Sequence, residues 1–403
     1  SISDVCIYFG GFLVTIIVLT GLAASTRHLF KQKDMLIVRI RRISQQARGG
    51  IDSSLNPVLV CGVPKMANMA DLSSICSHII YTGGMGIITD GVDFSLMPTD
   101  KADFHSFRSL DTTAARLLVS VSLGPLWQQV QGSVQWGRFG VGVAQFLSNT
   151  SVHGLEIRVA PSLSLNEDML AMVHVACTEM KYSDPELLFV FRTRYESILA
   201  KSGIMQQSVS CPDLLIFRTE HHELKSKVLR APNPYRRYLG ADMAELFLFQ
   251  ELEKISGLRG PVRNQEWCYS MVLGGLLFKY YMGLNFGNDA QSGPQEISLS
   301  EICERFSVKR FEDLRTLSFY SMEHTKHTWV GFDDDWSILR KASRLSIMSI
   351  LQNQDYGRPL CTAVFHANLD DHRQACGLGY APVLHRLRQF INNASYNSPM
   401  VVA

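Results

Sequence analysis

The sequence predicts an α/β fold: a closed (β/α)8 TIM barrel with a small insertion between strands 7 and 8, preceded by an N-terminal transmembrane helix. Eight short apolar runs recur along the chain, and the segments between them are long enough for a helix each. With 403 residues, of which 46% are hydrophobic and 19% charged, the chain can bury a large core and lacks the composition of a disordered protein.

The first predicted element is a membrane anchor. Residues 7–24, IYFGGFLVTIIVLTGLAA, contain no charged side chain, and this run is just long enough for a spanning helix; basic residues follow it. A secretory signal peptide would have a basic start and a shorter apolar run. We expect a truncated N-terminal end (1–6), a transmembrane signal anchor (7–24), a basic juxtamembrane stalk (25–55), the barrel (56–395) and a tail (396–403).

The barrel strands are expected at the eight apolar runs, although periodicity alone does not separate short buried strands from buried helix segments. Helices are expected at stretches such as MLAMVHVACTEMK from 169 and MAELFLFQELEKI from 243, and the longer last interval predicts the insertion at about 285–330. The runs are PVLVCGV (57), SHIIYTG (77), RLLVSVS (116), GLEIRV (154), ELLFVF (186), DLLIFRT (213), MVLGGLLF (271) and CTAVFHA (361).

The compartment of the barrel is predicted from two kinds of signal. The basic flank after the anchor, read by the positive-inside rule, would leave the barrel in the cytoplasm. The tripeptides NTS at Asn149 and NAS at Asn393, however, are acceptors for N-glycosylation, and the chain has nine cysteines. We therefore expect a single-pass type II membrane protein whose barrel is extracellular or lumenal, with a secreted protein as the alternative.

Several classes of ligand are disfavoured. The formal net charge of +2 argues against nucleic acid, which needs a strong basic excess. His153, His221, His222 and His366 suggest a metal site, and the first three are expected near the barrel mouth, but no metal-ligand spacing accompanies them. The acidic run from 333 to 335 is interpreted as helix capping. We expect no metal and no cofactor.

From about Asn56 to Asn392 the chain resembles the family 18 glycoside hydrolases, the chitinases and chitinase-like lectins. LVCGVPK followed by DLSSICSHIIYTGG resembles the first two strands of that family, and RFGVGVAQFLSNTSVHGLEI resembles the helix and strand that lead into its catalytic site. TWVGFDDDWSILRKA from 328 is the most specific match, followed by CTAVFHANLDDHRQACG from 361. The resemblance implies a TIM barrel that binds a glycan such as chitin.

The resemblance also implies two disulfides, Cys61 with Cys76 and Cys303 with Cys376. The other cysteines are odd in number, so one further disulfide has room among them. They are Cys6, Cys177, Cys211, Cys268 and Cys361.

The catalytic strand of the family carries D-x-x-D-x-D-x-E, whose last residue protonates the glycosidic oxygen while the preceding aspartate supports the acetamido group of the substrate as nucleophile. In this sequence the four positions hold His153, Glu156, Arg158 and Ala160. A methyl group has no proton to give, and an arginine stays protonated at working pH. The resemblance thus implies a barrel without the hydrolytic chemistry of the family.

The positions around this strand also depart from the family. The M-x-Y-D signature of the sixth strand reads RTEH from Arg218 to His221, with Glu220 as its third residue, and the tryptophan that floors the sugar site is Phe365. Trp127 follows the third strand, where binding residues of a barrel collect, and could stack on a sugar ring. The residues assigned to the cleft are Trp127, Arg218, Glu220, His221 and Phe365.

Glu156, Arg158, Arg218 and Glu220 are all expected to point into the barrel near its mouth. One interpretation is an internal ion-pair network, because an unpaired buried arginine costs several kcal/mol. The other is that Arg158 and Arg218 bind an acidic group of a ligand, because a guanidinium matches carboxylates and sulfates.

The function expected from these residues is a membrane-anchored, catalytically inactive chitinase-like protein that binds carbohydrate, such as chitin oligosaccharides, or a protein partner. The alternatives are a hydrolase whose acid has moved to Glu156 or Glu220, and a structural matrix protein. A lectin would have an open groove with exposed aromatic rings, whereas a structural barrel would have a plugged mouth.

Overall fold

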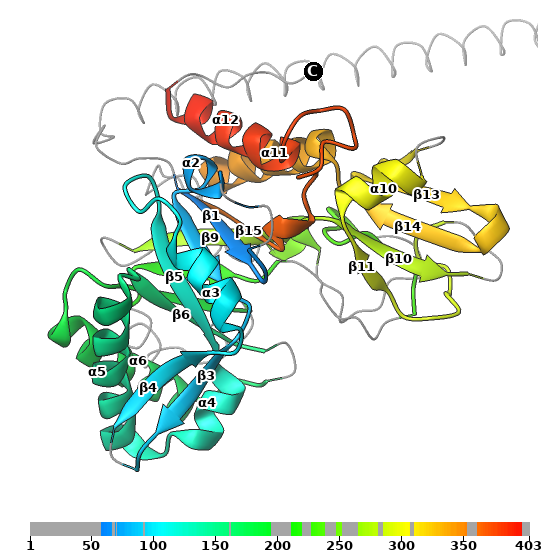
Figure 1. Cartoon of the computed structure of the whole chain (residues 1–403). Helices are drawn as coiled ribbons and strands as arrows, with labels where there is room; N and C mark the ends of the chain where they lie inside the picture. Colours follow the sequence, from blue (N-terminus) through cyan, green and yellow to red (C-terminus); the bar gives the residue numbers. More distant parts are fainter. Residues whose placement is uncertain are drawn as a thin grey trace, which may run out of the picture. The chain divides into compact units, whose positions relative to one another are not determined.

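Eight parallel strands close into a barrel in the computed structural model (Figure 1), which confirms the predicted architecture. The structure describes residues 58–66, 69, 71–91, 93–160, 163–194, 211–219, 227–237, 247–251, 265–280, 285–306, 310–352 and 361–396. Around the barrel the order is β1-β15-β9-β8-β7-β6-β5-β2. The strands are β1 (Leu59–Val63), β2 (His78–Tyr81), β5 (Arg116–Ser122), β6 (Gly154–Arg158), β7 (Leu188–Thr193), β8 (Leu214–Phe217), β9 (Glu266–Val272) and β15 (Cys361–Phe365).

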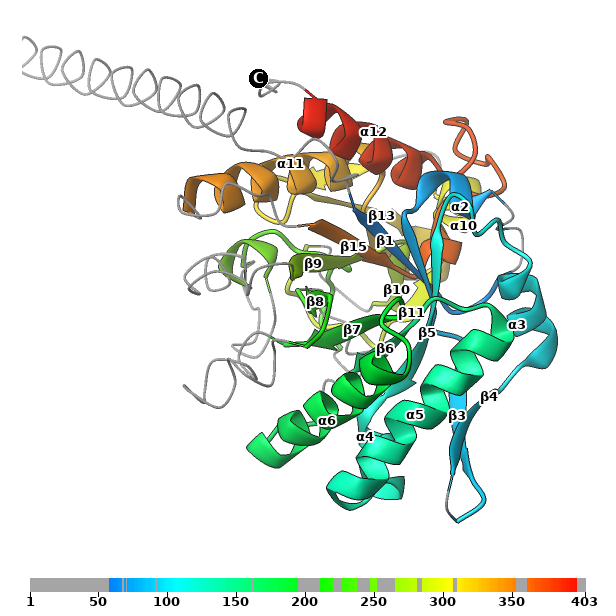
Figure 2. The same cartoon turned by 90° about the vertical axis from the view of Figure 1, so that its left-hand side faces the viewer.

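Side chains alternate between the two faces of each barrel strand, and each face has its own apolar cluster. The outward-facing residues pack beneath the surrounding helices in the large core, whereas a smaller cluster that includes Val60, Ile80, Leu118 and Val190 fills the barrel interior. Figure 2 shows the helices outside the strands. They are α2 (Leu72–Ile75), α3 (Lys101–Arg108), α4 (Leu123–Gln129), α5 (Gly132–Thr150), α6 (Glu167–Ser183), α11 (Asp335–Gln352) and α12 (Pro382–Tyr396).

The pair α5 and α6 packs tightly beside the barrel. A side chain at Gly140 would place its Cβ 2.5 Å from the carbonyl oxygen of Ala176, so only glycine allows this approach. Helix α6 begins two residues before the predicted stretch because the Asn166 side chain accepts a hydrogen bond from the Met169 amide (2.8 Å) and caps the helix. The other helix predicted from sequence, from 243, lies mostly outside the described residues.

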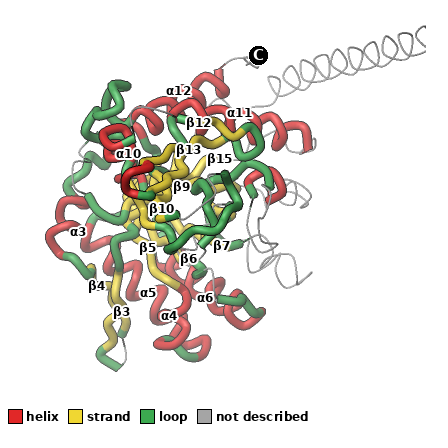
Figure 3. Tube along the Cα trace, turned by 90° about the vertical axis from the view of Figure 1, so that its right-hand side faces the viewer, coloured by secondary structure: helices red, strands yellow, loops and turns green. Residues whose placement is uncertain are grey.

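A five-stranded antiparallel sheet is inserted between β9 and β15, with the order β11-β10-β14-β13-β12 (Figure 3). It starts earlier than expected, because the run MVLGGLLF belongs to two sheets: β9 ends at Val272, and β10 begins at Gly275 after Gly274 turns the chain with a φ of 82°. The added elements are β10 (Gly275–Lys279), β11 (Gln295–Ile297), α10 (Leu299–Arg305), β12 (Phe311–Asp313), β13 (Ser318–Glu323) and β14 (Thr328–Phe332).

The acidic run at the start of α11 has two roles rather than one. Asp334 accepts a hydrogen bond from the Ser337 amide (2.9 Å), which is the predicted capping. Asp333, in contrast, forms a fully buried ion pair with Lys341, whose ammonium also donates to the hydroxyl of Ser318 (2.7 Å) on β13. Helix α11 is thereby joined to the inserted sheet.

Four disulfides are present. Cys61–Cys76 and Cys303–Cys376 are the pairs that the family resemblance implies. Cys177–Cys211 and Cys268–Cys361 are further pairs, one more than expected; the last joins neighbouring strands β9 and β15. Four disulfides indicate an extracellular or lumenal protein, because thiols stay reduced in the cytosol.

No helix in the described part of the chain is long and apolar enough to cross a membrane. The anchor predicted at 7–24, the stalk, and Cys6 lie outside the described residues, as does nearly all of the tail.

Candidate functional site

Three charged side chains and one aromatic side chain lie inside the barrel toward the carboxyl ends of its strands. They are Glu156, Arg158, Arg192 and Phe365. Strand β6 pairs with β7 so that Glu156 is level with Val190 and Arg158 is level with Arg192. Residues two apart on a strand share a face, so Glu156 and Arg158 both face the interior, as predicted. Phe365 lies on the same inner face at the end of β15.

Glu156 is the deepest of these groups, with an exposed fraction of 0%. Its Oε1 lies 3.9 Å from Nη1 of Arg192, and neither carboxylate oxygen accepts a hydrogen bond. A buried acceptor without a hydrogen bond keeps its full desolvation cost. Glu156 is therefore a weakly held buried carboxylate that solvent does not reach.

Arg192 covers one face of the Phe365 ring, which the sequence assigned to the cleft. Its guanidinium carbon lies 3.3 Å from the centroid of the Phe365 ring, a cation–π contact. A Cβ at Gly62 would lie 2.1 Å from the same ring, so the backbone of β1 packs against it as well. Phe365 is 1% exposed, so its ring does not form an open surface within the described structure.

Sequence reasoning missed Arg192, although a signal was present. The run ELLFVF is followed directly by this arginine, which shares the inner face with Val190. A charged residue on the inner face of an apolar barrel strand would have identified it.

Arg158 departs from the predicted ion-pair network. It is half-buried at the last position of β6, and its guanidinium makes no hydrogen bond or ion pair within the described structure, because Glu156 pairs with Arg192 instead. Burial is the main cause that lowers the pKa of Arg158; the charge of Glu156 raises it, and the charge of Arg192 lowers it further. The result is a protonated guanidinium in a partly desolvated place.

Arg218 directly follows β8, where it is buried and donates its amide to the Thr193 carbonyl (2.8 Å). It thus lies at the expected end of the barrel. Glu220 and His221, which complete the predicted cleft, lie outside the described residues, and so does His222.

Solved structures of chitinases and chitinase-like proteins match this chain over most of its length. Among them are YKL-39 with chitooligosaccharides (TM-score 0.66, 15% identity, 83% of this chain and 100% of that chain) and the group IV chitinase of Ostrinia furnacalis (0.62, 15%, 84% and 100%). A family 18 chitinase of Cycas revoluta in complex with (GlcNAc)3 matches with a TM-score of 0.61, 13% identity and coverages of 82% and 99%. The chain has the fold of the family 18 chitinases. No protein-family model matches the sequence, and no curated protein sequence does either.

Within this chitinase fold, the four positions of the degenerate motif do not form one cluster. His153 precedes β6 at the amino end of the barrel strands, where its Nδ1 accepts a hydrogen bond from the Leu117 amide (3.0 Å). Burial and the charge of Arg116 lower its pKa. Ala160 lies at the other end, two residues beyond β6, and is half-buried. The expectation that His153 lies near the mouth was therefore wrong.

The remaining candidate ligands are also dispersed in the chitinase fold. His366 follows β15, with its Nδ1 3.3 Å from Oε2 of Glu296 in the inserted sheet. Among the described residues, no three histidine, cysteine or acidic side chains are grouped as a metal site would require.

Trp127 lies on α4, the helix that follows β5. Its half-buried ring packs against the large core, with its centroid 6.1 Å from that of Trp136 on α5. This packing accounts for the position of Trp127 without a sugar ligand.

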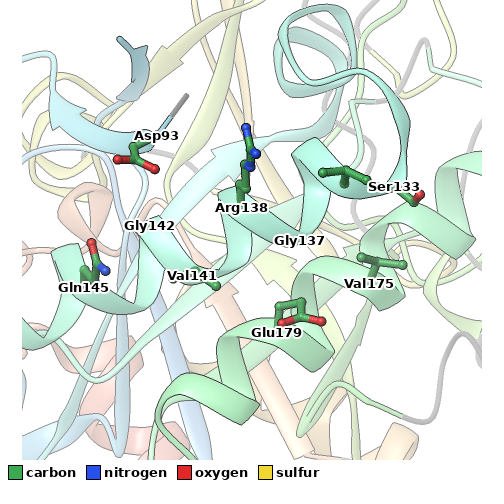
Figure 4. Close-up of a pocket in the computed structure, with 10 residues that line it drawn as sticks. Asp93, Ser133, Gly137, Arg138, Val141, Gly142, Gln145, Val175 and Glu179 are labelled. Carbon is green, nitrogen blue, oxygen red and sulfur yellow. The ribbon is translucent and has the colours of Figure 1, made fainter. Parts of the chain in front are cut away.

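A hollow of about 470 Å³ opens on the outside of the chitinase barrel (Figure 4). It lies between α5 and α6 beside Asp93, and Arg138 and Glu179 are among the residues that line it. None of the residues that the sequence assigned to the site takes part in it.

The two predicted glycosylation positions lie on helices at the surface. Asn149 is exposed in the last turn of α5, and Asn393 is exposed near the end of α12. Both are accessible, and their modification stays a prediction.

Proposed function

We propose that the protein is a chitinase-like carbohydrate-binding protein that does not hydrolyse glycosidic bonds. The observation that carries this proposal is the chemistry of β6. Its inner face presents Glu156 and Arg158, and the position that resembles the catalytic acid of the family holds Ala160.

The buried state of Glu156 supports this proposal against a relocated acid. A general acid must come within hydrogen-bond reach of the glycosidic oxygen. Glu156 lies four residues before Ala160, which corresponds to about 13 Å along a strand, and it is fully buried beside Arg192. A substrate bound at the mouth would not reach its carboxylate.

Carbohydrate binding is supported by the fold and by the compartment. YKL-39 and the Cycas revoluta chitinase, whose folds match this chain, are described with bound chitooligosaccharides. Active sites and binding sites of TIM barrels lie at the carboxyl ends of the strands, where Arg158 ends β6 and Arg218 directly follows β8. The disulfides support an extracellular or lumenal location, where glycans of matrices and cell surfaces occur.

The test is to incubate the full chain with insoluble chitin and with soluble chitooligosaccharides, and to assay hydrolysis products in the same samples. Binding without products supports the proposal. Products above a blank without protein would contradict it, and loss of those products in Glu156→Gln or Glu220→Gln would identify the acid. Absence of both binding and products would contradict carbohydrate binding.

Residues 7–24 are proposed to anchor the protein, with the barrel on the extracellular or lumenal side. The support is the uncharged apolar run together with the four disulfides. A protease protection assay on sealed vesicles that contain the full chain tests both points: an anchored lumenal barrel survives until detergent is added. A barrel that carbonate releases from the membrane would contradict the anchor.

A further inference from the structure

The side chain of Arg158, at the end of β6, forms no ion pair with any residue that the structure describes. Arg158 is half-buried and faces the barrel interior, and its guanidinium makes no hydrogen bond or ion pair within the described structure. Buried guanidinium groups in folded proteins are normally paired, because an unmatched charge away from water is costly. An unmatched one at a barrel mouth is a place where a ligand can supply the missing partner.

The charges around Arg158 favour an anionic ligand. Its register neighbour on β7 is Arg192, a second positive charge, and its neighbour on β5 is Ser122, which is neutral. Among the described residues, the carboxylate that acts on it is Glu156, which is already paired with Arg192 and lies deeper in the barrel. Two guanidinium groups on adjacent strands repel each other, and an anion between them would relieve that repulsion.

The enclosed state of Phe365 excludes the alternative in which the ligand stacks on an aromatic floor. The guanidinium of Arg192 covers the ring at 3.3 Å, and the ring is 1% exposed. A neutral sugar ring has no access to the Phe365 ring, so this ring does not serve as a stacking platform.

We propose that Arg158 binds the carboxylate or sulfate group of an acidic glycan that enters the barrel mouth. The planar fork of its N–H donors matches two oxygens of either group, which a lysine ammonium cannot do in the same way. This assignment rests on the proposed carbohydrate-binding function and names the class of glycan.

The experiment measures affinities of the full chain for three oligosaccharides of equal length: one neutral, one with uronic acid carboxylates and one with sulfate esters. Inorganic sulfate is the fourth probe. We expect at least one acidic oligosaccharide to bind about tenfold or more tightly than the neutral one. Arg158→Gln should abolish that preference, and Arg158→Lys should restore only part of it.

The matched control is Arg108→Gln, which removes the same charge from an exposed position on α3. It should leave every affinity unchanged, and thermal unfolding of each variant checks that the fold is intact. An equal loss in both variants would reduce the effect to overall charge and overturn the assignment.

The other outcomes separate the two proposals. Equal affinity for neutral and acidic oligosaccharides, unaffected by Arg158→Gln, would overturn the anion site and keep the proposed function. Binding of inorganic sulfate but of no oligosaccharide would overturn the glycan assignment and the proposed function together. If the carboxylate and sulfate oligosaccharides differ, the tighter one identifies which acidic group is recognised.

Discussion

Two buried carboxylates in this protein are each paired with a cation, and their surroundings differ sharply. Asp333, at the start of α11, contacts the Lys341 ammonium and also accepts hydrogen bonds from the Asn233 amide (2.9 Å) and the Ser337 hydroxyl (3.3 Å). Glu156, inside the barrel, has Arg192 at 3.9 Å, and within the described part of the chain its oxygens accept no hydrogen bond.

The difference shows which pair serves the architecture. A buried ion pair is stable when hydrogen bonds satisfy its remaining lone pairs and protons, and the pair at α11 meets this condition. The pair in the barrel does not, although both carboxylates are completely buried. Polar groups held poorly in an otherwise well-packed fold are typical of sites kept for binding rather than stability.

The largest expected effect is the loss of the cation at α11. Lys341→Met leaves Asp333 buried without a counter-ion, so we expect the free energy of unfolding to fall by about 3 to 5 kcal/mol. Urea unfolding of the full chain, followed by tryptophan fluorescence, measures this change.

Arg340→Met is the matched control. Arg340 is next to Lys341 in the sequence, but its ion pair with Glu312 lies near the surface. Exposed pairs of this kind contribute about 0 to 1 kcal/mol. Equal losses in the two variants would contradict the structural role assigned to the buried pair.

A partly buried histidine, His78, makes the stability of the folded chain depend on pH, so the two carboxylates are best compared at one pH. His78 begins β2 beside Arg116, and burial together with that positive charge lowers its pKa from 6.5 to about 4. Below pH 6.5 the unfolded chain binds a proton that the folded chain takes up only near pH 4. The contribution of His78 is therefore complete above pH 6.5 and falls by up to about 3 kcal/mol as the pH decreases to 4.

Unfolding at pH 7 and at pH 5 tests this dependence. His78→Gln should lose less stability between the two pH values than the wild type, whereas His105→Gln, at an exposed position on α3, should behave as the wild type. Identical pH dependence in wild type and His78→Gln would exclude His78 as the cause.

Much of the barrel could be predicted from the sequence, because each strand alternates burial on two faces. The same alternation predicts that Glu156 and Arg158 face the barrel interior, and both do. The boundary between β9 and β10 could not be placed, because strands of both sheets are buried and the apolar run continues across Gly274. A local composition does not say which sheet a buried strand joins.

The contacts of the candidate site were harder to predict from the sequence, because they depend on which residues are neighbours in space. Arg192 and Phe365 come from strands far apart in the sequence, and the cation–π contact between them follows from side-chain conformations. The same is true of the partner of Glu156, which is Arg192 and not Arg158. The sequence predicted that Glu156 and Arg158 face the barrel interior, but the structure was needed to identify Arg192 and to show how these charges pair.

The smallest expected effect is on the barrel carboxylate itself. Glu156→Gln preserves the shape of the side chain and replaces a carboxylate whose oxygens accept no hydrogen bond from the described residues. The free energy of unfolding should therefore change by less than about 1 kcal/mol at pH 7. Asp333→Asn makes the same chemical change at the other carboxylate and should cost several times more, because it leaves the ammonium of Lys341 buried without its counter-ion. Urea unfolding of both variants gives the comparison directly. A loss in Glu156→Gln as large as that in Asp333→Asn would mean that Arg192 depends on this carboxylate, and that the barrel pair is as structural as the pair at α11.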